Sequence, residues 1–293
     1  MNHQSLPSAN PVNESGSALT IQTNPLKSLS SLPYQERFSG FREALDHHFP
    51  GTISMRKYVH SSKVSLEPFG FFKHNSLACI SICRDEITKP FMAMIQKNWD
   101  NVFSFSGLAG MLCMGKTGFL SAYHHAPVCD SLRRQIFFVF THIGLGPEGE
   151  FGQCYRRLRN IVSPACGALL AFQQEIAQGI ATPYSFDPLD PEQSLIRQKL
   201  MLSEDRFATP DLVTLTKRAH GQIIKDLEHM ITALINPSET NYAVFSGIQI
   251  HGPDQRCYIW PGYTYATLNG ECYNLPSISG VQKFPTFPSI GLS

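Results

Sequence analysis

Two short apolar runs constrain most strongly what this chain can fold into. Residues 77–82 and 136–140 are almost continuously apolar. An apolar run of this length without amphipathic spacing is typical of a strand covered on both faces, as in the parallel sheet of an α/β protein. Each run leads into a residue that can bind a metal, Cys83 after the first and His142 after the second. Because ligands of open α/β sheets bind beyond the carboxyl ends of the strands, both residues are expected at the functional edge.

The composition excludes several classes of protein. The chain has 293 residues, 42% of them hydrophobic and 16% charged, which is enough for a large hydrophobic core. A formal net charge of +1 gives no electrostatic basis for binding nucleic acid or an anionic membrane. No apolar run approaches the roughly 18 residues that span a bilayer. The first twenty residues lack a signal peptide, and eight cysteines are irregularly spaced, so we predict a cytoplasmic protein with free thiols.

The chain divides into a tail and one domain. Residues 1–33 are rich in Ser, Asn and Pro and have few large apolar groups, which predicts a disordered tail. Residues 34–293 contain no linker or internal repeat, so a single domain is expected. Hydrophobic spacing predicts helices over residues 34–58, 89–99, 118–126 and 195–202, one beginning at Cys166, and one over 210–234 with Thr209 as N-cap. Strands are expected at 77–83, 102–105, 136–142, 242–250 and 256–260, and a terminal hairpin turns at Asn269-Gly270.

One segment matches the phosphate-binding pattern G-x-x-x-x-G-K-[ST]. It runs from Gly110 to Thr117, and in a nucleotide-binding protein Lys116 would reach the phosphates while Thr117 would bind Mg²⁺. The four variable positions are bulky and apolar, and no apolar run ending in Asp follows to hold Mg²⁺. These features favour a packed backbone turn, and a P-loop nucleotide-binding protein remains a remote alternative.

Cys83, His142 and Cys166 form a candidate metal-binding set. The spacings are 59 and 24 residues, and Cys166 stands where an apolar helix is expected to begin, a place that lowers the pKa of a thiol. Zn²⁺ accepts two thiolates and one imidazole and leaves a fourth position for water, which is the catalytic pattern. From the spacing alone, buried structural cysteines and a hydrogen-bonded core histidine are the favoured interpretation, because none of the short C-x-x-C spacings is present. Among the other histidines, His251 also follows an apolar run and is the reserve ligand.

Several motifs in this order resemble one known family, the limiting-CO₂-inducible B/C proteins. These are β-carbonic-anhydrase-like proteins, sometimes called theta-type. The resemblance covers about residues 35–275 and rests on the following segments: Cys83–Thr88, Gly115–Gly118, His124–Pro127, His142–Gly144, Ala165–Leu169, Ala219-His220 and Ala243–Gly252. It also accounts for Gly115-Lys116-Thr117 without a phosphate site.

The resemblance implies a fold, a cofactor and a reaction. The fold would be a β-carbonic-anhydrase-like α/β domain with a largely parallel central sheet flanked by helices. Zn²⁺ would be held by Cys83, His142 and Cys166, and the enzyme, a carbonic anhydrase, would reversibly hydrate CO₂ to bicarbonate by attack of zinc-bound hydroxide. Asp85 and Arg84 would form a dyad, in which Arg84 keeps Asp85 ionised and Asp85 orients the zinc-bound water.

Three further expectations accompany this resemblance. Relatives of this kind imply a homodimer. A zinc-bearing member with weak or no activity, acting as a scaffold that handles CO₂ or bicarbonate, is the main alternative function. Glu86 is expected to be structural, and no role is assigned to the pair His124-His125.

Overall fold

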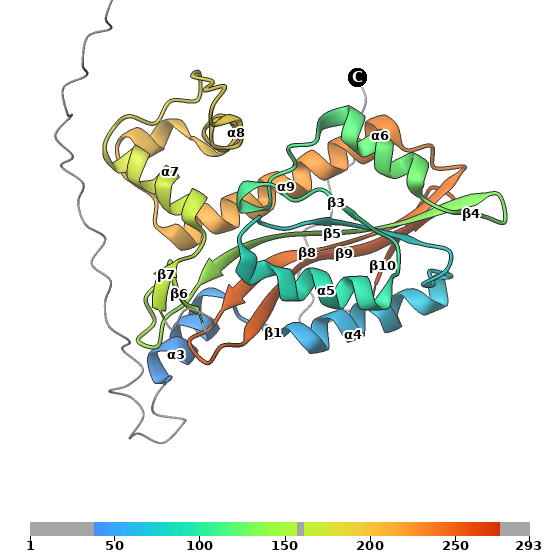
Figure 1. Ribbon diagram of the computed structural model, residues 1–293, viewed down its shortest axis with the longest axis horizontal. Coiled ribbons are helices and arrows are strands. Elements are labelled where there is room, and N and C mark those ends of the chain that lie inside the picture. The colour runs from blue at the N-terminus through green and yellow to red at the C-terminus, as the bar shows by residue number, and fades with distance from the viewer. Residues whose placement is uncertain (1–37, 157–160, 276–293) are drawn as a thin grey trace, which may run out of the picture.

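A computed structural model describes residues 38–156 and 161–275 of the chain, and Figure 1 shows their arrangement. A mixed sheet forms the centre, and helices cover both of its faces. The predicted α/β fold with a largely parallel sheet is therefore confirmed. The predicted tail over residues 1–33 lies outside the described residues, and the division into a tail and one domain stays a prediction.

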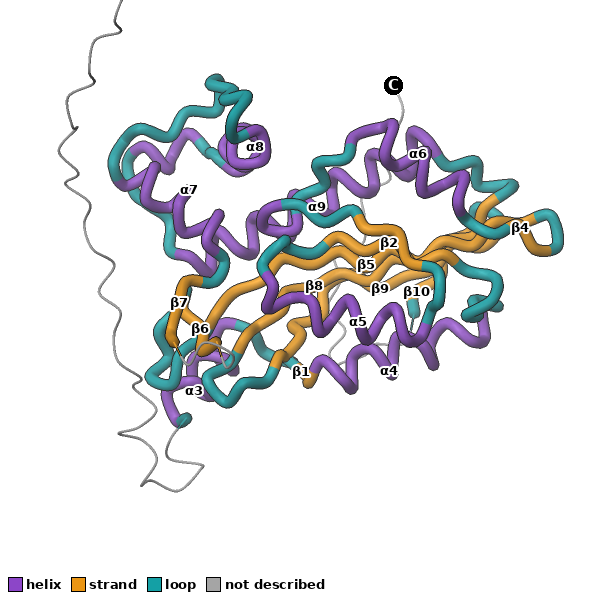
Figure 2. Tube along the Cα trace, in the orientation of Figure 1, coloured by secondary structure: helices purple, strands orange, loops and turns teal. Residues whose placement is uncertain are grey.

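The central sheet has the order β1-β9-β8-β5-β2-β3, with β10 paired to β9 and β4 paired to β5. Its strands are β1 Ile53–Ser54, β2 Leu77–Ser81, β3 Val102–Ser104, β4 Val128–Cys129, β5 Leu132–Gly144, β8 Thr240–His251, β9 Cys257–Leu268 and β10 Glu271–Asn274. Strands β3, β2, β5 and β8 are parallel neighbours, whereas β9 is antiparallel to β8. A separate hairpin, β6 Gln153–Arg156 with β7 Ile161–Pro164, lies near the carboxyl end of β5 (Figure 2).

Two hydrophobic cores fill the space between the sheet and its helices. The helices are α3 Ser39–His48, α4 Met55–Leu66, α5 Lys89–Asn98, α6 Gly115–His125, α7 Gly167–Ala177, α8 Pro191–Leu200 and α9 Leu212–Leu234, with short 3₁₀ turns η1 Glu67–Phe69, η2 Glu86–Thr88, η3 Leu108–Gly110 and η4 Ser203–Arg206. Helices α4 and α5 cover one face, and α6 and α9 cover the other (Figure 1). Residues alternate along β5, so that Phe137 and Val139 enter one core and Phe138 and Phe140 enter the other.

The structure corrects three predicted boundaries. Within the described residues, the single helix expected over 34–58 is two helices, because the chain turns after Phe49 through Gly51, whose φ is +78°. Helix α9 begins at Leu212 with Asp211 as its N-cap, in place of Thr209, since Asp211 accepts a hydrogen bond from the Thr214 N–H at 2.8 Å. Strand β9 continues beyond the predicted 256–260 to Leu268.

The predicted terminal hairpin is confirmed. Strands β9 and β10 pair in antiparallel fashion, with Leu268 opposite Glu271. Asn269 and Gly270 both have positive φ, +52° and +83°, which is the backbone geometry that a two-residue hairpin turn requires.

The segment that matches the phosphate-binding pattern is packed against the sheet. A Cβ atom on Gly110 would lie 2.2 Å from the carbonyl oxygen of Phe140, so this backbone touches β5 directly. Met111 and Leu112 are buried. This geometry agrees with the packed turn and leaves no open loop around a phosphate.

All eight cysteines are free. Of these, Cys79, Cys83, Cys154 and Cys166 are buried. No helix in residues 38–156 and 161–275 is long and apolar enough to cross a membrane.

Candidate metal centre

The carboxyl ends of the parallel strands position the candidate site. Cys83 lies two residues beyond the end of β2, and His142 stands near the end of β5. Because these strands are parallel, their carboxyl ends meet at one edge of the sheet. Cys166 arrives at the same edge as the N-cap of α7, directly after the β6–β7 hairpin. Three segments far apart in the chain thus converge there.

The three predicted ligands lie close together. One potential ligand atom from each of Cys83, His142 and Cys166 lies within 4.8 Å of the other two, and all three residues are buried. Both ring nitrogens of His142 are buried without a hydrogen-bond partner in the described part of the chain. A buried imidazole with no partner is costly unless something binds it, so the donor set fits a metal ion.

The two sulfur atoms influence each other. Cys83 Sγ lies 3.8 Å from Cys166 Sγ. The hydrogen bond with Cys166 lowers the pKa of Cys83 well below its ordinary value. The same contact, followed by burial, raises the pKa of Cys166, and the N–H groups at the start of α7 offset this only in part. The N–H groups at the start of α7 therefore act on Cys166 in the predicted direction, and the neighbouring Cys83 and burial outweigh them.

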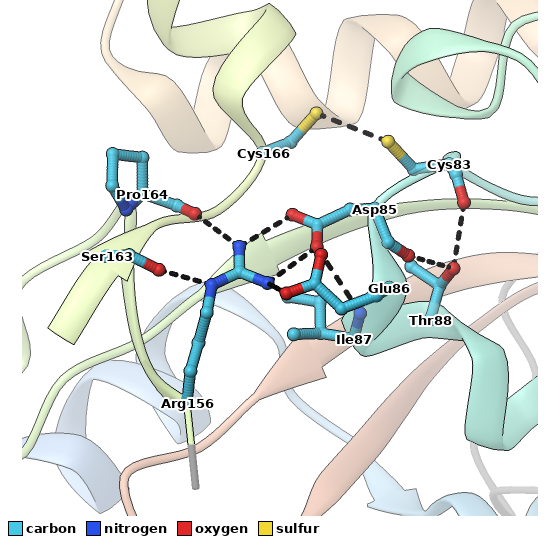
Figure 3. A network of polar contacts seen from close by, with 9 residues as sticks. All are labelled: Cys83, Asp85, Glu86, Ile87, Thr88, Arg156, Ser163, Pro164 and Cys166. Carbon is cyan, nitrogen blue, oxygen red and sulfur yellow. Dashed lines mark hydrogen bonds and ion pairs between the residues drawn. The ribbon is translucent and has the colours of Figure 1, made fainter. Parts of the chain in front are cut away.

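Asp85 is held in place by Arg156 (Figure 3). The guanidinium of Arg156 donates two hydrogen bonds, from Nη1 to Oδ1 at 2.8 Å and from Nη2 to Oδ2 at 3.0 Å. It also donates to the carbonyl oxygen of Pro164 at 2.9 Å and to Ser163 Oγ. Burial is the largest single influence and raises the pKa of Asp85. The hydrogen bonds and charge of Arg156, together with His142 and the Ile87 N–H, outweigh it and lower that pKa to about 2. The carboxylate is thus charged near neutral pH.

Arg84 does not pair with Asp85 in the structure, which corrects the predicted dyad. Its Nη2 donates to Glu192 Oε1 at 2.5 Å, and its side chain is 61% exposed. The physical reason is that Arg84 and Asp85 lie in the bend between β2 and η2, which directs Arg84 toward Glu192 and Asp85 toward Arg156. Arg156 occupies the place that was predicted for Arg84.

Two further residues shape the site, and the sequence analysis did not identify either of them. Thr88 Oγ1 donates to the carbonyl oxygens of both Cys83 and Asp85 at 2.8 Å, which closes the turn between them. Arg156 belongs to a cluster of three arginines whose members look alike in the sequence. Its distinguishing signal in the sequence is its position ten residues before Cys166. In the structure it lies on β6, which pairs with β7, the strand that leads to that cysteine.

The other residues noted in the sequence take separate places. Glu86 forms an ion pair with Arg156, which agrees with a structural role. His251 is buried beside His142, with ring centroids 5.3 Å apart, and burial is the main cause that lowers its pKa to about 3. Within the described residues, His124 and His125 do not join the metal-binding group; His125 contacts the carbonyl oxygen of Ser121 instead.

Comparison with solved structures agrees with the fold. The crystal structure of limiting CO₂-inducible protein LCIB is similar, with a TM-score of 0.64 and 30% identity over 79% of this chain and 97% of that chain. The crystal structure of PtLCIB4, a homolog of LCIB, has a TM-score of 0.68 and 25% identity over 80% of this chain and 99% of that one. No curated protein matches the chain.

The family comparison covers most of the chain. The sequence profile of the limiting CO₂-inducible proteins B/C, β-carbonic anhydrases, matches residues 52–267. This range includes all four parallel strands of the sheet, the candidate ligands, and both Asp85 and Arg156. The chain therefore belongs to the limiting CO₂-inducible protein B/C family of β-carbonic anhydrases.

Proposed function

We propose that this protein is a zinc-dependent carbonic anhydrase that reversibly hydrates CO₂ to bicarbonate. One observation carries the proposal: two thiols and an imidazole converge at a buried point, two residues along the chain from a carboxylate kept ionised by Arg156. Membership of the family supports the same class of reaction.

The donor set suits zinc. Cys83 and Cys166 supply two sulfur ligands and His142 supplies one nitrogen, a combination that Zn²⁺ accepts readily. In the described residues no fourth Cys, His, Asp or Glu joins the group, which leaves one coordination position for water. When bound, Zn²⁺ would supply its usual chemistry, lowering the pKa of a water molecule toward neutrality.

Asp85 and Arg156 would orient the reacting water molecule. Asp85, ionised and fixed by two hydrogen bonds, can accept a proton in a hydrogen bond and so orient a water molecule for attack on CO₂. Arg156 serves as a positioning residue, since it keeps this carboxylate charged and directed. Because Cys83, His142 and Cys166 are buried, bulk water has little access to the reacting groups.

Metal analysis tests the cofactor. We expect about one zinc ion per chain in the purified protein and a near-complete loss in Cys83→Ser or Cys166→Ser, because each removes one of three protein ligands. Cys79→Ser is the matched control: Cys79 is equally buried and lies on β2, four residues before Cys83, outside the ligand group. Equal zinc in wild type and in both ligand variants would refute the site.

A stopped-flow CO₂ hydration assay tests the reaction. The zinc-loaded protein should hydrate CO₂ well above the buffer rate, and Asp85→Asn should retain zinc but lose roughly a hundredfold or more in kcat/KM. Full zinc loading without a rate above buffer would instead favour the bicarbonate-handling scaffold. Undiminished activity of Asp85→Asn would remove Asp85 from the reaction.

Two further expectations remain proposals. We propose a homodimer, and exposed apolar side chains on the segment between α7 and α8 support it. The cytoplasmic location stays a prediction from the sequence.

A further inference from the structure

Cys83 and Asp85 are joined by a short turn that the side chain of Thr88 closes. Thr88 Oγ1 lies 2.8 Å from the main-chain carbonyl oxygen of Cys83 and 2.8 Å from that of Asp85. The Thr88 N–H also donates to the Asp85 carbonyl oxygen, at 3.1 Å. A hydroxyl group has one hydrogen to donate, so the two carbonyl oxygens share it. One side chain thus holds the main chain of both residues.

This bonding is unusual for the position of Thr88 in the chain. Thr88 is the N-cap residue of α5, where a threonine side chain ordinarily accepts a hydrogen bond from an N–H group of the first helical turn. Helix α5 has no side-chain cap of this kind. The hydroxyl is directed back to the turn instead (Figure 3), so it stabilises the turn rather than the end of the helix.

The core of the protein fixes the place of Thr88. The residue is 1% exposed, and it is followed by the first turns of α5, where Phe91 and Ile95 are fully buried. Phe91 packs on Phe140 of β5, with ring centroids 4.8 Å apart. The hydroxyl is therefore held in a set position relative to β5, the strand that carries His142.

Asp85 is then held from two directions (Figure 3). Arg156, on the β6–β7 hairpin, binds the carboxylate, and Thr88, at the start of α5, binds the main chain. The first contact keeps the carboxylate charged and directed, whereas the second sets how far Asp85 stands from Cys83. This separation matters, because a displacement of about 1 Å in a positioned group can lower a rate roughly a hundredfold.

We propose that Thr88 is a positioning residue for CO₂ hydration, which fixes Asp85 relative to the metal centre by locking the turn to Cys83. The inference rests on the proposed carbonic anhydrase function. Metal binding needs the thiol of Cys83, whereas the reaction also needs Asp85 in its place. Loss of the Thr88 hydroxyl is therefore expected to impair the reaction and to spare the metal.

Kinetics with metal analysis gives the first test. Thr88→Val keeps the shape of the side chain and removes the hydroxyl, so we expect wild-type zinc content and a roughly tenfold to hundredfold fall in both kcat and kcat/KM. Thr88→Ser, which retains the hydroxyl, should recover most of this loss. Thr216→Val is the matched control: Thr216 is also fully buried, its hydroxyl donates to the Leu212 carbonyl oxygen at 2.7 Å, and it lies on α9 outside the candidate metal centre. This control should keep the wild-type kcat/KM.

Crystallography of the zinc-loaded variants gives a readout that is independent of activity. In Thr88→Val, or in Thr88→Ala if the valine variant does not fold, the main chain of Asp85 should move relative to Cys83. The two hydrogen bonds from Arg156 to Asp85 should then no longer both form, while Cys83 still binds zinc. An Asp85 that keeps its wild-type place without the Thr88 hydroxyl would overturn the proposal.

The outcomes separate the two proposals. An active wild type with unchanged activity in Thr88→Val overturns the positioning role and leaves the carbonic anhydrase intact. Loss of zinc in Thr88→Val also overturns that role, because the hydroxyl would then serve the metal ligand Cys83 and not Asp85. An equal fall in Thr88→Ser does the same, since the hydroxyl is present there. A zinc-loaded wild type without CO₂ hydration overturns the proposed function and, with it, the role of Thr88 in the reaction.

Discussion

At the scale of single residues, Asp85 is where most polar contacts of the site converge. Its carboxylate accepts two hydrogen bonds from Arg156, and it caps η2 by accepting the Ile87 N–H at 3.3 Å. Its main-chain carbonyl oxygen accepts from Thr88. The bonds to its two carboxylate oxygens hold this side chain in one orientation.

The first prediction at this scale concerns the two arginines. Arg156→Gln should lower kcat/KM for CO₂ hydration roughly tenfold to a hundredfold at unchanged zinc content, because Asp85 loses its bidentate partner. Arg84→Gln should stay within about threefold of wild type, since the ion pair that Arg84 forms among the described residues is with Glu192 and its side chain is 61% exposed. Stopped-flow assays with metal analysis of the same samples measure both effects.

A conservative variant separates positioning from simple charge. Arg156→Lys should remain impaired, because an ammonium group cannot reproduce the fork that Arg156 presents to both oxygens of Asp85. Full activity in Arg156→Lys, or a larger loss in Arg84→Gln than in Arg156→Gln, would contradict the assignment.

At the scale of elements, the first turn of α8 joins the two segments that carry the thiols. Glu192 accepts hydrogen bonds from Arg84, next to Cys83, and from the Leu108 N–H at 2.7 Å. Gln193 donates to the carbonyl oxygen of Ala168, two residues after Cys166, at 3.3 Å. An ion pair between Arg197 and Glu175 holds α8 on α7. Helix α8 thus braces both sides of the candidate metal centre.

This arrangement predicts unequal effects on stability. Glu192→Ala should lower the free energy of unfolding by about 1–3 kcal/mol, since it leaves the Leu108 N–H without its partner. Arg84→Gln should cost less than about 1 kcal/mol, because it removes only an ion pair whose arginine is exposed. Urea denaturation of the zinc-loaded protein measures both values. Equal losses of unfolding free energy in the two variants would show that the ion pair, and not the bond to the Leu108 N–H, provides the stabilisation.

At the scale of the whole molecule, large apolar side chains are exposed near α7 and α8. The five most exposed in this region, each at least 60% exposed, are Ile180, Tyr184, Phe186, Leu189 and Phe207. Except for Phe207, they lie on the segment that connects α7 and α8. Exposed apolar groups gathered in one region are typical of a protein–protein interface, and a second copy of the chain is the partner expected from the sequence.

The homodimer can be tested directly. Size-exclusion chromatography with light scattering should give twice the mass of one chain for the wild type and a single-chain mass for the double variant Leu189→Glu, Phe207→Glu, because buried charges without partners oppose association. Val128→Glu is the control: Val128 is 57% exposed on β4, at the opposite end of the molecule (Figure 1). A monomeric wild type, or a dimer unaffected by the double variant, would refute this interface.

Much of the fold could be predicted because its signals are local. The apolar runs that became β2 and β5 have the length and composition of strands buried on both faces. The turn at Asn269-Gly270 depends on the few residues that tolerate positive φ. The break between α3 and α4 is also local: Pro50-Gly51 is a turn signal, and Ser54 caps α4. The apolar spacing continues across this turn and by itself predicts one helix.

The sequence by itself determined which residue types stand at the strand ends: Cys83 and His142 follow apolar runs, and Cys166 precedes an apolar helix. The tertiary structure alone decided that Arg156, and not Arg84, holds Asp85. It alone decided, too, that Gln249 and His251 lie beside His142. The physical reason is that residue type and periodicity can be read from neighbouring positions along the chain. The partner of a side chain depends instead on the register between distant strands, and for Asp85 on where the β6–β7 hairpin places the guanidinium of Arg156.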